Sequence, residues 1–212
     1  MPVEAAELQQ MVNRLRQGEQ QALAELFTLY GEQLRRMIHL RLDHRLNARV
    51  SPSDVLQEAY LDALQRVPHY FAKPDLPFLG WLRLIVGQRL IEVHRQHLGA
   101  QQRDAGREIS LTRGSWPSAS SVCLAARLVA HLASPSQVAV RNEAVALLEG
   151  ALDQMDPIDR EVLVLRHFEE LSNNEVAELL GLERAAASKR YVRALGRLKE
   201  ILSRVPGFFE QA

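Results

Sequence analysis

SNNEVAELLGLERAAASKRYVRALGRLK, residues 172–199, decides the fold class of this chain. Ser172 and Glu175 form a capping box, because each side chain can bond the backbone amide of the other at the start of a helix. Gly181 stands where a helix ends in a left-handed turn, and Leu182 can fill the angle to a second helix. The spacing predicts a helix-turn-helix, in which the second helix is presented to the major groove of DNA.

The second helix of this motif is basic. It contains only two acids, Glu183 and Glu200. Its cations are Arg184, Lys189, Arg190, Arg193, Arg197 and Lys199. The small residues 185–188 would allow close approach to a groove, and a local excess of cations suits a phosphate surface. Glu183 is a poorer N-cap than Ser, Thr, Asp or Asn. Taken alone, the motif is also compatible with an ordinary helical hairpin that has a solvated, charged face.

Length and composition limit the class of protein to which this motif belongs. A chain of 212 residues is long enough for one large or two small domains, and 47% apolar with 25% charged residues is ordinary for a globular protein. The net charge is zero, so a nucleic-acid surface must be a local patch. Cys123 is the single cysteine, which fits a reducing compartment. No apolar run approaches the ~18 residues of a membrane span, so we expect a cytoplasmic protein without membrane insertion.

The N-terminal part of the chain is predicted to be helical. Apolar residues recur at helical spacing over residues 7–46, with a break at 16–19. Ser51 and Pro52 then begin a helix whose outer side carries acids and amides, namely Asp54, Gln57, Glu58 and Asp62. Paired carboxylates can serve as general acids and bases or as metal ligands. Neither a His-x-x-x-Glu pattern nor an Asp-rich loop accompanies them, which argues against catalysis and metal binding. Two interpretations are left: a solvated acidic face, or a face that docks a partner protein.

The next segment combines a loop and a long helix. The prolines of residues 69–77 predict a loop, whose two aromatics and lysine suit capture of an unstacked base, although such aromatics often belong to a core. Residues 78–97 are predicted to form a helix with an outward polar face of Arg83, Gln88, Arg89, Glu92, His94, Arg95 and His97. His94 and His97 have a spacing that can bind metal, but no further ligand is near in sequence. We therefore expect a nucleic-acid face here, without a metal or cofactor.

A change of composition divides the chain. Residues 99–139 are rich in Gly, Pro, Ser and Thr and are predicted to be a linker. Residues 122–132 inside it are apolar enough for a short helix, whose packing the sequence leaves open. Two cap-plus-proline starts, at Ser134 and Asp156, introduce the helices that precede the helix-turn-helix. The prediction is an all-α chain with helical domains at 1–98 and 140–212.

These segments together resemble a known family. They are SPSDVLQEAYLDALQRV (51–67), FLGWLRLIVGQRLIEVHR (78–95) and LDQMDPIDREVLVLRHFEELSNNEVAELLGLERAAASKRYVRALGRLKEIL (152–202). Their order and spacing resemble a bacterial RNA polymerase sigma factor of the sigma-70 family. More narrowly, the chain resembles the extracytoplasmic-function (ECF, group IV) class, which keeps only the second and fourth sigma domains.

The resemblance implies a transcription initiation factor that performs no chemistry itself. Such a factor binds core RNA polymerase through the β′ clamp helices and the β flap, reads the −35 and −10 elements of promoter DNA, and opens the duplex at −10. An anti-sigma factor is a further candidate partner. The long linker would occupy the RNA exit path of the polymerase.

The resemblance also implies roles for particular residues. The polymerase-binding candidates are Asp54, Gln57, Glu58 and Leu61. The candidates for −10 DNA are Phe71, Lys73, Arg83, Gln88, Arg89, Glu92 and Arg95. The candidates for −35 DNA are Arg184, Ala187, Ser188, Lys189, Arg190, Arg193 and Arg197. Of these, Ala187, Ser188 and Arg190 are expected nearest base edges, and Lys189, Arg193 and Arg197 on phosphates.

Two departures from the family pattern concern the −10 reader. Members of the family often carry Asn where this chain has Gln88 and Asp where it has Glu92, so each side chain here is one methylene longer. The −10 sequence that this chain reads is therefore open, whereas melting as such is not put in doubt.

Other classes of protein are alternatives to this interpretation. A stand-alone helix-turn-helix regulator would bind a palindromic site as a dimer and never contact polymerase. A metal-dependent hydrolase would have to use Asp54, Glu58, His94 and His97. A purely protein-binding helical adaptor would leave the basic recognition helix without a role.

Overall fold

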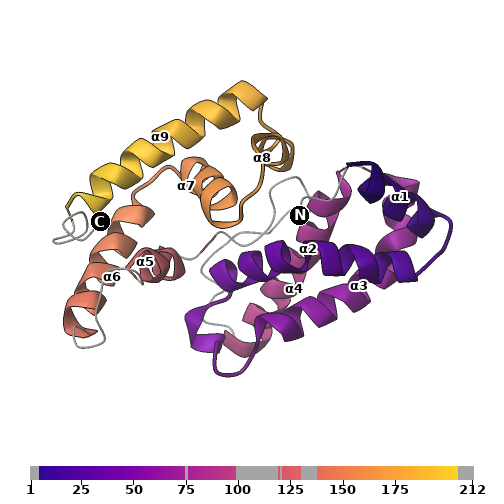
Figure 1. Ribbon diagram of the computed structural model, residues 1–212. Coiled ribbons are helices and arrows are strands. Elements are labelled where there is room, and N and C mark those ends of the chain that lie inside the picture. The colour runs from indigo at the N-terminus through magenta and orange to yellow at the C-terminus, as the bar shows by residue number, and fades with distance from the viewer. Residues whose placement is uncertain (1–4, 75, 99–118, 120, 130–137, 205–212) are drawn as a thin grey trace. The chain divides into compact units, whose positions relative to one another are not determined.

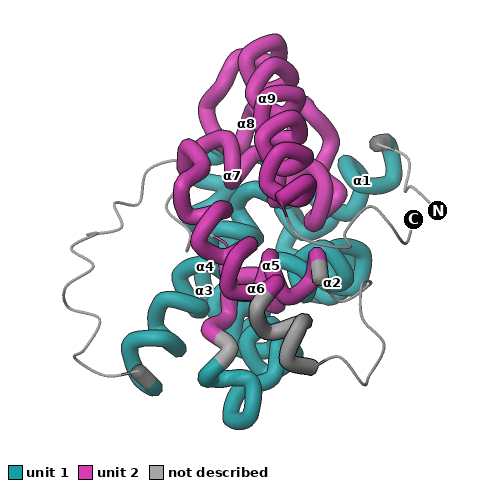
Figure 2. The backbone as a smooth tube through the Cα atoms, turned by 90° about the vertical axis from the view of Figure 1, so that its left-hand side faces the viewer, with its two compact units in different colours: residues 1–38, 45–117 teal, residues 39–44, 118–212 magenta. Residues whose placement is uncertain are grey.

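The computed structural model describes residues 5–74, 76–98, 119, 121–129 and 138–204, and its described residues form helices and turns without a strand. The chain divides into two compact units (Figure 2). Unit 1 comprises residues 1–38 and 45–117, and unit 2 comprises residues 39–44 and 118–212. Each unit has its own helices and buried residues, and each is taken in turn.

Unit 1 is built mainly from four helices (Figure 1). They are α1 (Ala5–Arg16), α2 (Gln21–Arg41), α3 (Pro52–Ala72) and α4 (Phe78–Leu98), with a short 3-10 turn η1 (His44–Leu46) between α2 and α3. The expected break after Arg16 is confirmed, and Gly18 has φ +92°, a conformation that favours glycine. Arg14 spans the break by bonding Glu19 (Nε–Oε2, 2.9 Å) and Glu25 (Nη1–Oε2, 2.6 Å).

Helix α3 runs further than the sequence predicted. The loop expected at 69–77 is wrong in its first half, because α3 continues through Pro68 to Ala72. A proline inside a helix removes one backbone hydrogen bond, and aromatic packing beyond it offsets that loss. The Tyr70 ring packs on Trp81 (centroids 4.9 Å apart) and on Phe78 (5.5 Å), and its hydroxyl donates to the Leu76 carbonyl at 3.1 Å. The ring contacts join α3 to α4, and the hydrogen bond joins α3 to the segment between the two helices.

Unit 2 contains the C-terminal helices. They are α5 (Ser121–Val129), α6 (Val138–Asp153), α7 (Pro157–Leu163), the π-helical turn η3 (Val164–Phe168), α8 (Asn173–Leu180) and α9 (Arg184–Leu202). The short helix expected within residues 122–132 is present as α5. Its packing, which the sequence left open, is now visible: Leu124 and Ala125 are buried in one cluster with Leu148 and Leu152 of α6. Most of the remaining expected linker lies outside the described residues.

The predicted helix-turn-helix is confirmed as α8, a turn and α9. The Ser172 hydroxyl accepts from the Glu175 amide (3.2 Å), and the Glu175 carboxylate accepts from the Ser172 amide (2.7 Å). Gly181 ends α8 in the left-handed region at φ 64°, and the Leu182 amide donates to the Ala177 carbonyl at 2.8 Å. Three apolar residues of α8, Val176, Ala177 and Leu179, are buried. The capping box and this turn together set where α9 begins.

The capping box supplies the first stability prediction. Ser172→Ala removes the hydroxyl that accepts from the Glu175 amide, so the free energy of unfolding should fall by about 1 kcal/mol. Urea denaturation of the full chain followed by circular dichroism measures this. Ser188→Ala, at an exposed position within α9, serves as the control and should change stability by less than about 0.5 kcal/mol. Equal effects of the two substitutions would contradict the assigned role of the cap.

Candidate nucleic-acid and partner interfaces

The four expected polymerase contacts form one exposed surface on α3. Asp54, Gln57, Glu58 and Leu61 are all exposed, and their spacing of three, four and seven residues places them on one helix face. Leu61 is 54% exposed, unusual for a large apolar side chain. This set is called the α3 stripe. Asp54 also completes a capping box by accepting from the Ser51 amide at 3.0 Å, and this backbone bond lowers the pKa of its carboxyl.

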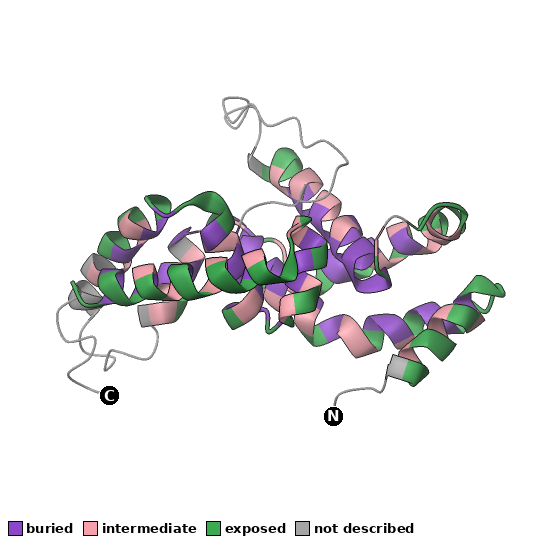
Figure 3. Ribbon diagram, turned by 90° about the horizontal axis from the view of Figure 1, so that it is seen from above, coloured by how far each residue is buried: buried purple, intermediate pink, exposed green. Residues whose placement is uncertain are grey.

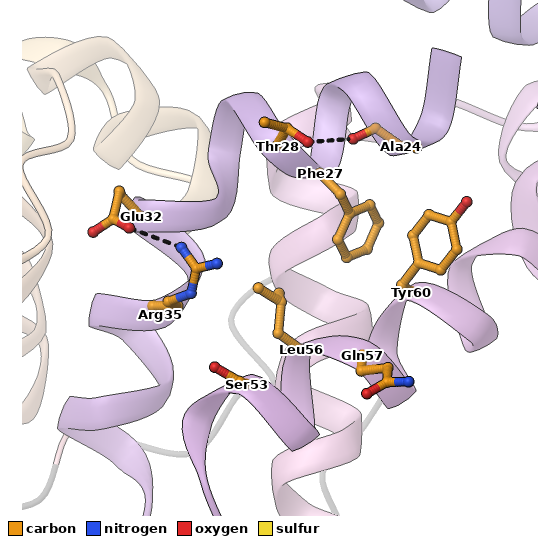
Figure 4. A pocket seen from close by; sticks show the side chains of 9 residues that line it. All are labelled: Ala24, Phe27, Thr28, Glu32, Arg35, Ser53, Leu56, Gln57 and Tyr60. Carbon is orange, nitrogen blue, oxygen red and sulfur yellow. Dashed lines mark hydrogen bonds and ion pairs between the residues drawn. The ribbon is translucent and has the colours of Figure 1, made fainter. Parts of the chain in front are cut away.

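A hollow of about 550 Å³ lies between α2 and α3, beside the α3 stripe (Figure 4). Phe27 and Tyr60 meet edge to face in its wall, with ring centroids 5.0 Å apart. Gln57 belongs to both the hollow and the stripe. The other lining residues are Ala24, Thr28, Glu32, Arg35, Ser53 and Leu56. This hollow could not be predicted from the sequence, because its walls come from two helices whose pairing no local pattern specifies.

The outward placement predicted for Arg83 is wrong. Its side chain is fully buried in unit 1, with 0% exposure. The first half of α4 is surrounded by protein, since Leu82, Arg83, Ile85 and Val86 are all buried although they are spread around the helix. A two-faced pattern therefore does not apply to this half of α4. The polar face begins only near Gln88 and extends to the exposed Arg95.

Arg89 is the centre of an ionic cluster that joins α4 to α3. Its guanidinium donates to Asp62 through Nε (3.0 Å) and Nη2 (2.5 Å), and its Nη1 lies 3.5 Å from Glu58 and 3.1 Å from Glu92. The Asp62 hydrogen bond is the main reason that the pKa of Arg89 is raised. The Arg89 side chain is only 19% exposed. Glu58 of the α3 stripe and two −10 candidates thus share one cluster.

Of the remaining −10 candidates, Gln88 and Arg95 belong to α4, whereas Phe71 and Lys73 lie at the end of α3. The Gln88 side-chain oxygen accepts from Arg66 Nη1 at 2.5 Å. Phe71, half-buried near the end of α3, contacts the Tyr70 ring at 5.1 Å and has the Arg16 guanidinium 5.2 Å from its ring centre. Lys73 and Arg95 are exposed. Arg66 was not predicted as part of this surface, because its partner Gln88 lies 22 positions away in the sequence.

On α9 the structure separates the −35 candidates into buried and exposed residues (Figure 3). The expectation that Ala187 lies nearest base edges is wrong, because Ala187 has 0% exposure. It belongs to the buried side of α9 with Ala194, Leu198 and Ile201, at helical spacing. Arg184, Ser188 and Lys189 are exposed. Arg197 lies on the surface and pairs with Glu200 at 2.9 Å.

The other two arginine candidates of α9 are held by one carboxylate of α7. Arg193 bonds both oxygens of Asp159, from Nε to Oδ2 at 2.5 Å and from Nη2 to Oδ1 at 2.7 Å. Arg190 Nη1 donates to Oδ1 of the same residue at 2.6 Å. These bonds, that of Arg193 foremost, lower the pKa of the Asp159 carboxyl, although its burial opposes the shift. The sequence did not indicate Asp159, which is 31 and 34 positions away.

The weak N-cap predicted at Glu183 is confirmed. Glu183 occupies the N-cap position of α9 and its side chain makes no capping hydrogen bond. A side chain from α8 bonds nearby instead: Asn173 Nδ2 donates to the Arg184 carbonyl at 3.0 Å. The start of α9 is therefore held from α8 rather than by its own cap.

The described part of the chain contains neither a cluster of metal ligands nor a membrane-spanning helix. Within it, no three His, Cys, Asp or Glu side chains gather as a metal site would require. None of its helices combines the length and apolar character needed to cross a membrane.

Known proteins resemble this chain in sequence. The family model "Sigma-70, region 4" matches residues 151–200. The ECF RNA polymerase sigma factor SigD of Mycobacterium tuberculosis is 26% identical over 200 residues, which cover 94% of this chain and 86% of SigD. BldN of Streptomyces coelicolor, also named an ECF sigma factor, is 23% identical over 94% of this chain and 67% of its own length. The sigma-E factor of Streptomyces antibioticus is 42% identical over 57 residues.

The fold resembles a solved structure as well. CnrH, in its complex with the cytosolic domain of CnrY, superposes with a TM-score of 0.52 over 92% of this chain and 96% of CnrH, at 20% identity. The helical units and the helix-turn-helix define a sigma-factor fold. Residues 151–200 thus match region 4 of the sigma-70 family, and the chain resembles ECF RNA polymerase sigma factors over 94% of its length.

Removing Arg89 should destabilise unit 1. Arg89→Ala leaves Asp62, which is 20% exposed, beside Glu58 and Glu92 without their shared cation. We expect the free energy of unfolding to fall by about 1–2 kcal/mol, and Arg89→Lys to recover part of it because lysine keeps the charge but not the fork. Urea denaturation measures both. Arg35→Ala, which removes a surface pair with Glu32, is the control and should have little effect.

Acid should remove the contribution of Asp159. Its pKa is lowered in the folded chain, so the unfolded state binds more protons as the pH falls through about 4. The stabilisation is thus present above that pH and is lost below it. Relative to Asp159→Asn, the wild-type chain should be more stable at pH 6, and this difference should shrink by pH 3. Urea titrations over this range test it, and a constant difference would contradict the assignment.

Proposed function

We propose that this chain brings core RNA polymerase to promoters, reads the −35 element with unit 2 and the −10 element with unit 1, and opens the duplex at −10. One observation carries the proposal. The same chain presents an exposed, cationic recognition helix in one unit and an exposed polar stripe with an apolar centre in the other. A stand-alone regulator needs the first of these surfaces but has no use for the second.

The proposal also assigns the parts of the chain. Residues 1–98 form the polymerase-binding and −10 domain, residues 99–139 the linker, and residues 140–212 the −35 domain, to which α5 is added because it packs on α6. The factor acts in the cytoplasm, where the polymerase works. It catalyses no reaction, since the polymerase makes the phosphodiester bonds.

The α3 stripe is proposed to bind the β′ clamp helices of polymerase. Protein interfaces combine a few apolar anchors with a polar rim. Leu61 supplies an exposed anchor, Gln57 and Glu58 supply polar contacts, and the adjoining hollow offers the Phe27 and Tyr60 rings. Binding of the β flap by unit 2 and of an anti-sigma factor remain predictions from the family resemblance.

The −10 surface is proposed to comprise Phe71, Lys73, Gln88, Arg89, Glu92 and Arg95. Unstacking a base costs a few kcal/mol, and aromatic contacts with cationic phosphate clamps can offset it. Phe71 is half-buried and already packed on Tyr70, so it can offer a preformed ring face. Arg83 is left out because it is buried. By the same reasoning the −35 surface comprises Arg184, Ser188, Lys189, Arg190, Arg193 and Arg197, without the buried Ala187.

The α3 stripe yields a direct test of polymerase binding. Leu61→Glu replaces the exposed apolar anchor by a charge, so co-elution of the factor with core RNA polymerase should weaken at least about tenfold, as for a central interface residue. Stability should be little affected, because Leu61 is exposed. Gln10→Glu, at an exposed position of α1, adds the same charge and should co-elute like the wild type. Equal co-elution of both variants would refute the proposed docking face.

A further inference from the structure

Asp159 stands out in unit 2 as a buried acid that bonds the recognition helix. It lies in the first turn of α7 and is 5% exposed. All three of its bonds to Arg190 and Arg193 are between 2.5 and 2.7 Å. Asp156, one turn earlier, is 3.5 Å from Arg190 and caps α7 by accepting from the Asp159 amide at 3.1 Å. The carboxylate is thus held in place before any DNA is bound.

Arg193 is hydrogen-bonded to Asp159 but remains exposed to solvent. A guanidinium has five N–H donors in a rigid fork, and Asp159 takes donors on Nε and Nη2. The Arg193 side chain nevertheless remains 62% exposed, so its other donors face solvent. A side chain held in this way loses little conformational freedom when it meets a ligand. Arg190, at 27% exposure, is held more deeply by the same carboxylate.

The carboxylate also changes how these arginines meet DNA. Non-specific binding grows with the number of phosphates that cations neutralise, and it carries no sequence information. Two arginines paired with one buried aspartate carry a net charge of about +1 together rather than +2, by simple addition of formal charges. Both arginines therefore bind the phosphates of non-promoter DNA less readily. Arg193 still offers oriented N–H donors to a promoter sequence that has acceptors in the right positions.

We propose that Asp159 is a positioning residue that raises the sequence selectivity of the recognition helix. It orients Arg193 and Arg190 and weakens their non-specific binding to DNA phosphates. This inference rests on the proposed function of α9 as the −35 reader. A purely structural role, in which Asp159 only ties α7 to α9, would affect stability alone.

The test compares Asp159→Asn with a matched control in the full-length chain. Asp153→Asn makes the same change of charge in the same unit, where Asp153 accepts from Arg160 Nη1 (2.9 Å) and from Ser121 Oγ (2.6 Å) and not from α9. Fluorescence anisotropy measures binding to a non-promoter duplex between 50 and 200 mM salt. Asp159→Asn should bind it about three- to tenfold more tightly at low salt, and the slope of log K against log salt should steepen by about 1. Asp153→Asn should show neither change.

A second measurement uses core polymerase and a promoter fragment selected with the wild-type factor. The ratio of promoter to non-promoter transcripts should fall for Asp159→Asn and hold for Asp153→Asn. Arg193→Lys keeps the charge but cannot form the fork, so it should lower the ratio with little change of salt slope. This variant also decides the matter if Asp159→Asn does not fold.

The outcomes separate the two proposals. Asp159→Asn matching Asp153→Asn in both salt slope and transcript ratio would overturn the role of Asp159, as would an unchanged ratio for Arg193→Lys. If the wild-type chain directs no promoter transcripts at all, the proposed function fails. The salt-slope comparison on duplex DNA would still decide whether Asp159 withholds these arginines from phosphate.

Discussion

One buried carboxylate, that of Asp159, joins α7 to the helix that is proposed to read the −35 element. A buried charge is costly unless it is paired and hydrogen-bonded, and Asp159 meets that requirement through Arg190 and Arg193 of α9. The pairing joins α7 to the side of α9 that carries Arg190 and Arg193, while Ala187 and Ala194 are buried and Ser188 and Lys189 are exposed. The left-handed turn at Gly181 sets the direction in which α9 leaves α8.

Unit 1 contains a similar ionic cluster in which one cation, rather than one anion, lies at the centre. There one arginine, Arg89, is surrounded by Asp62 and Glu58 from α3 and Glu92 from α4. Glu58 belongs to the proposed polymerase face and Glu92 to the proposed −10 face, so the two surfaces are held by one ionic cluster. A substitution at Glu58 therefore changes the surroundings of Arg89 as well as the docking face. Effects on polymerase binding and on promoter opening have to be measured separately for such variants.

The sequence predicted the features that depend on near neighbours. The capping boxes at Ser51 and Ser172, the break near Gly18 and the turn at Gly181 all follow from residues within a few positions of one another. It failed where distant packing decides. Arg83 is buried although its neighbours in sequence gave no sign of it, Tyr70 packs on Trp81 beyond Pro68, and Asp159 meets Arg193 across 34 positions of sequence. Among the site residues, sequence reasoning therefore found the exposed α3 stripe but misjudged Ala187 and missed the carboxylate behind the arginines.

The proposed function requires that this chain directs polymerase to promoters. The most direct measurement is in vitro transcription from a pool of genomic fragments with core RNA polymerase, with and without the protein, followed by mapping of the transcript starts. The account predicts defined starts that appear only with the protein and that share sequence elements near −35 and −10. The absence of new starts, while the protein still binds DNA by itself, would contradict the account and favour a stand-alone regulator.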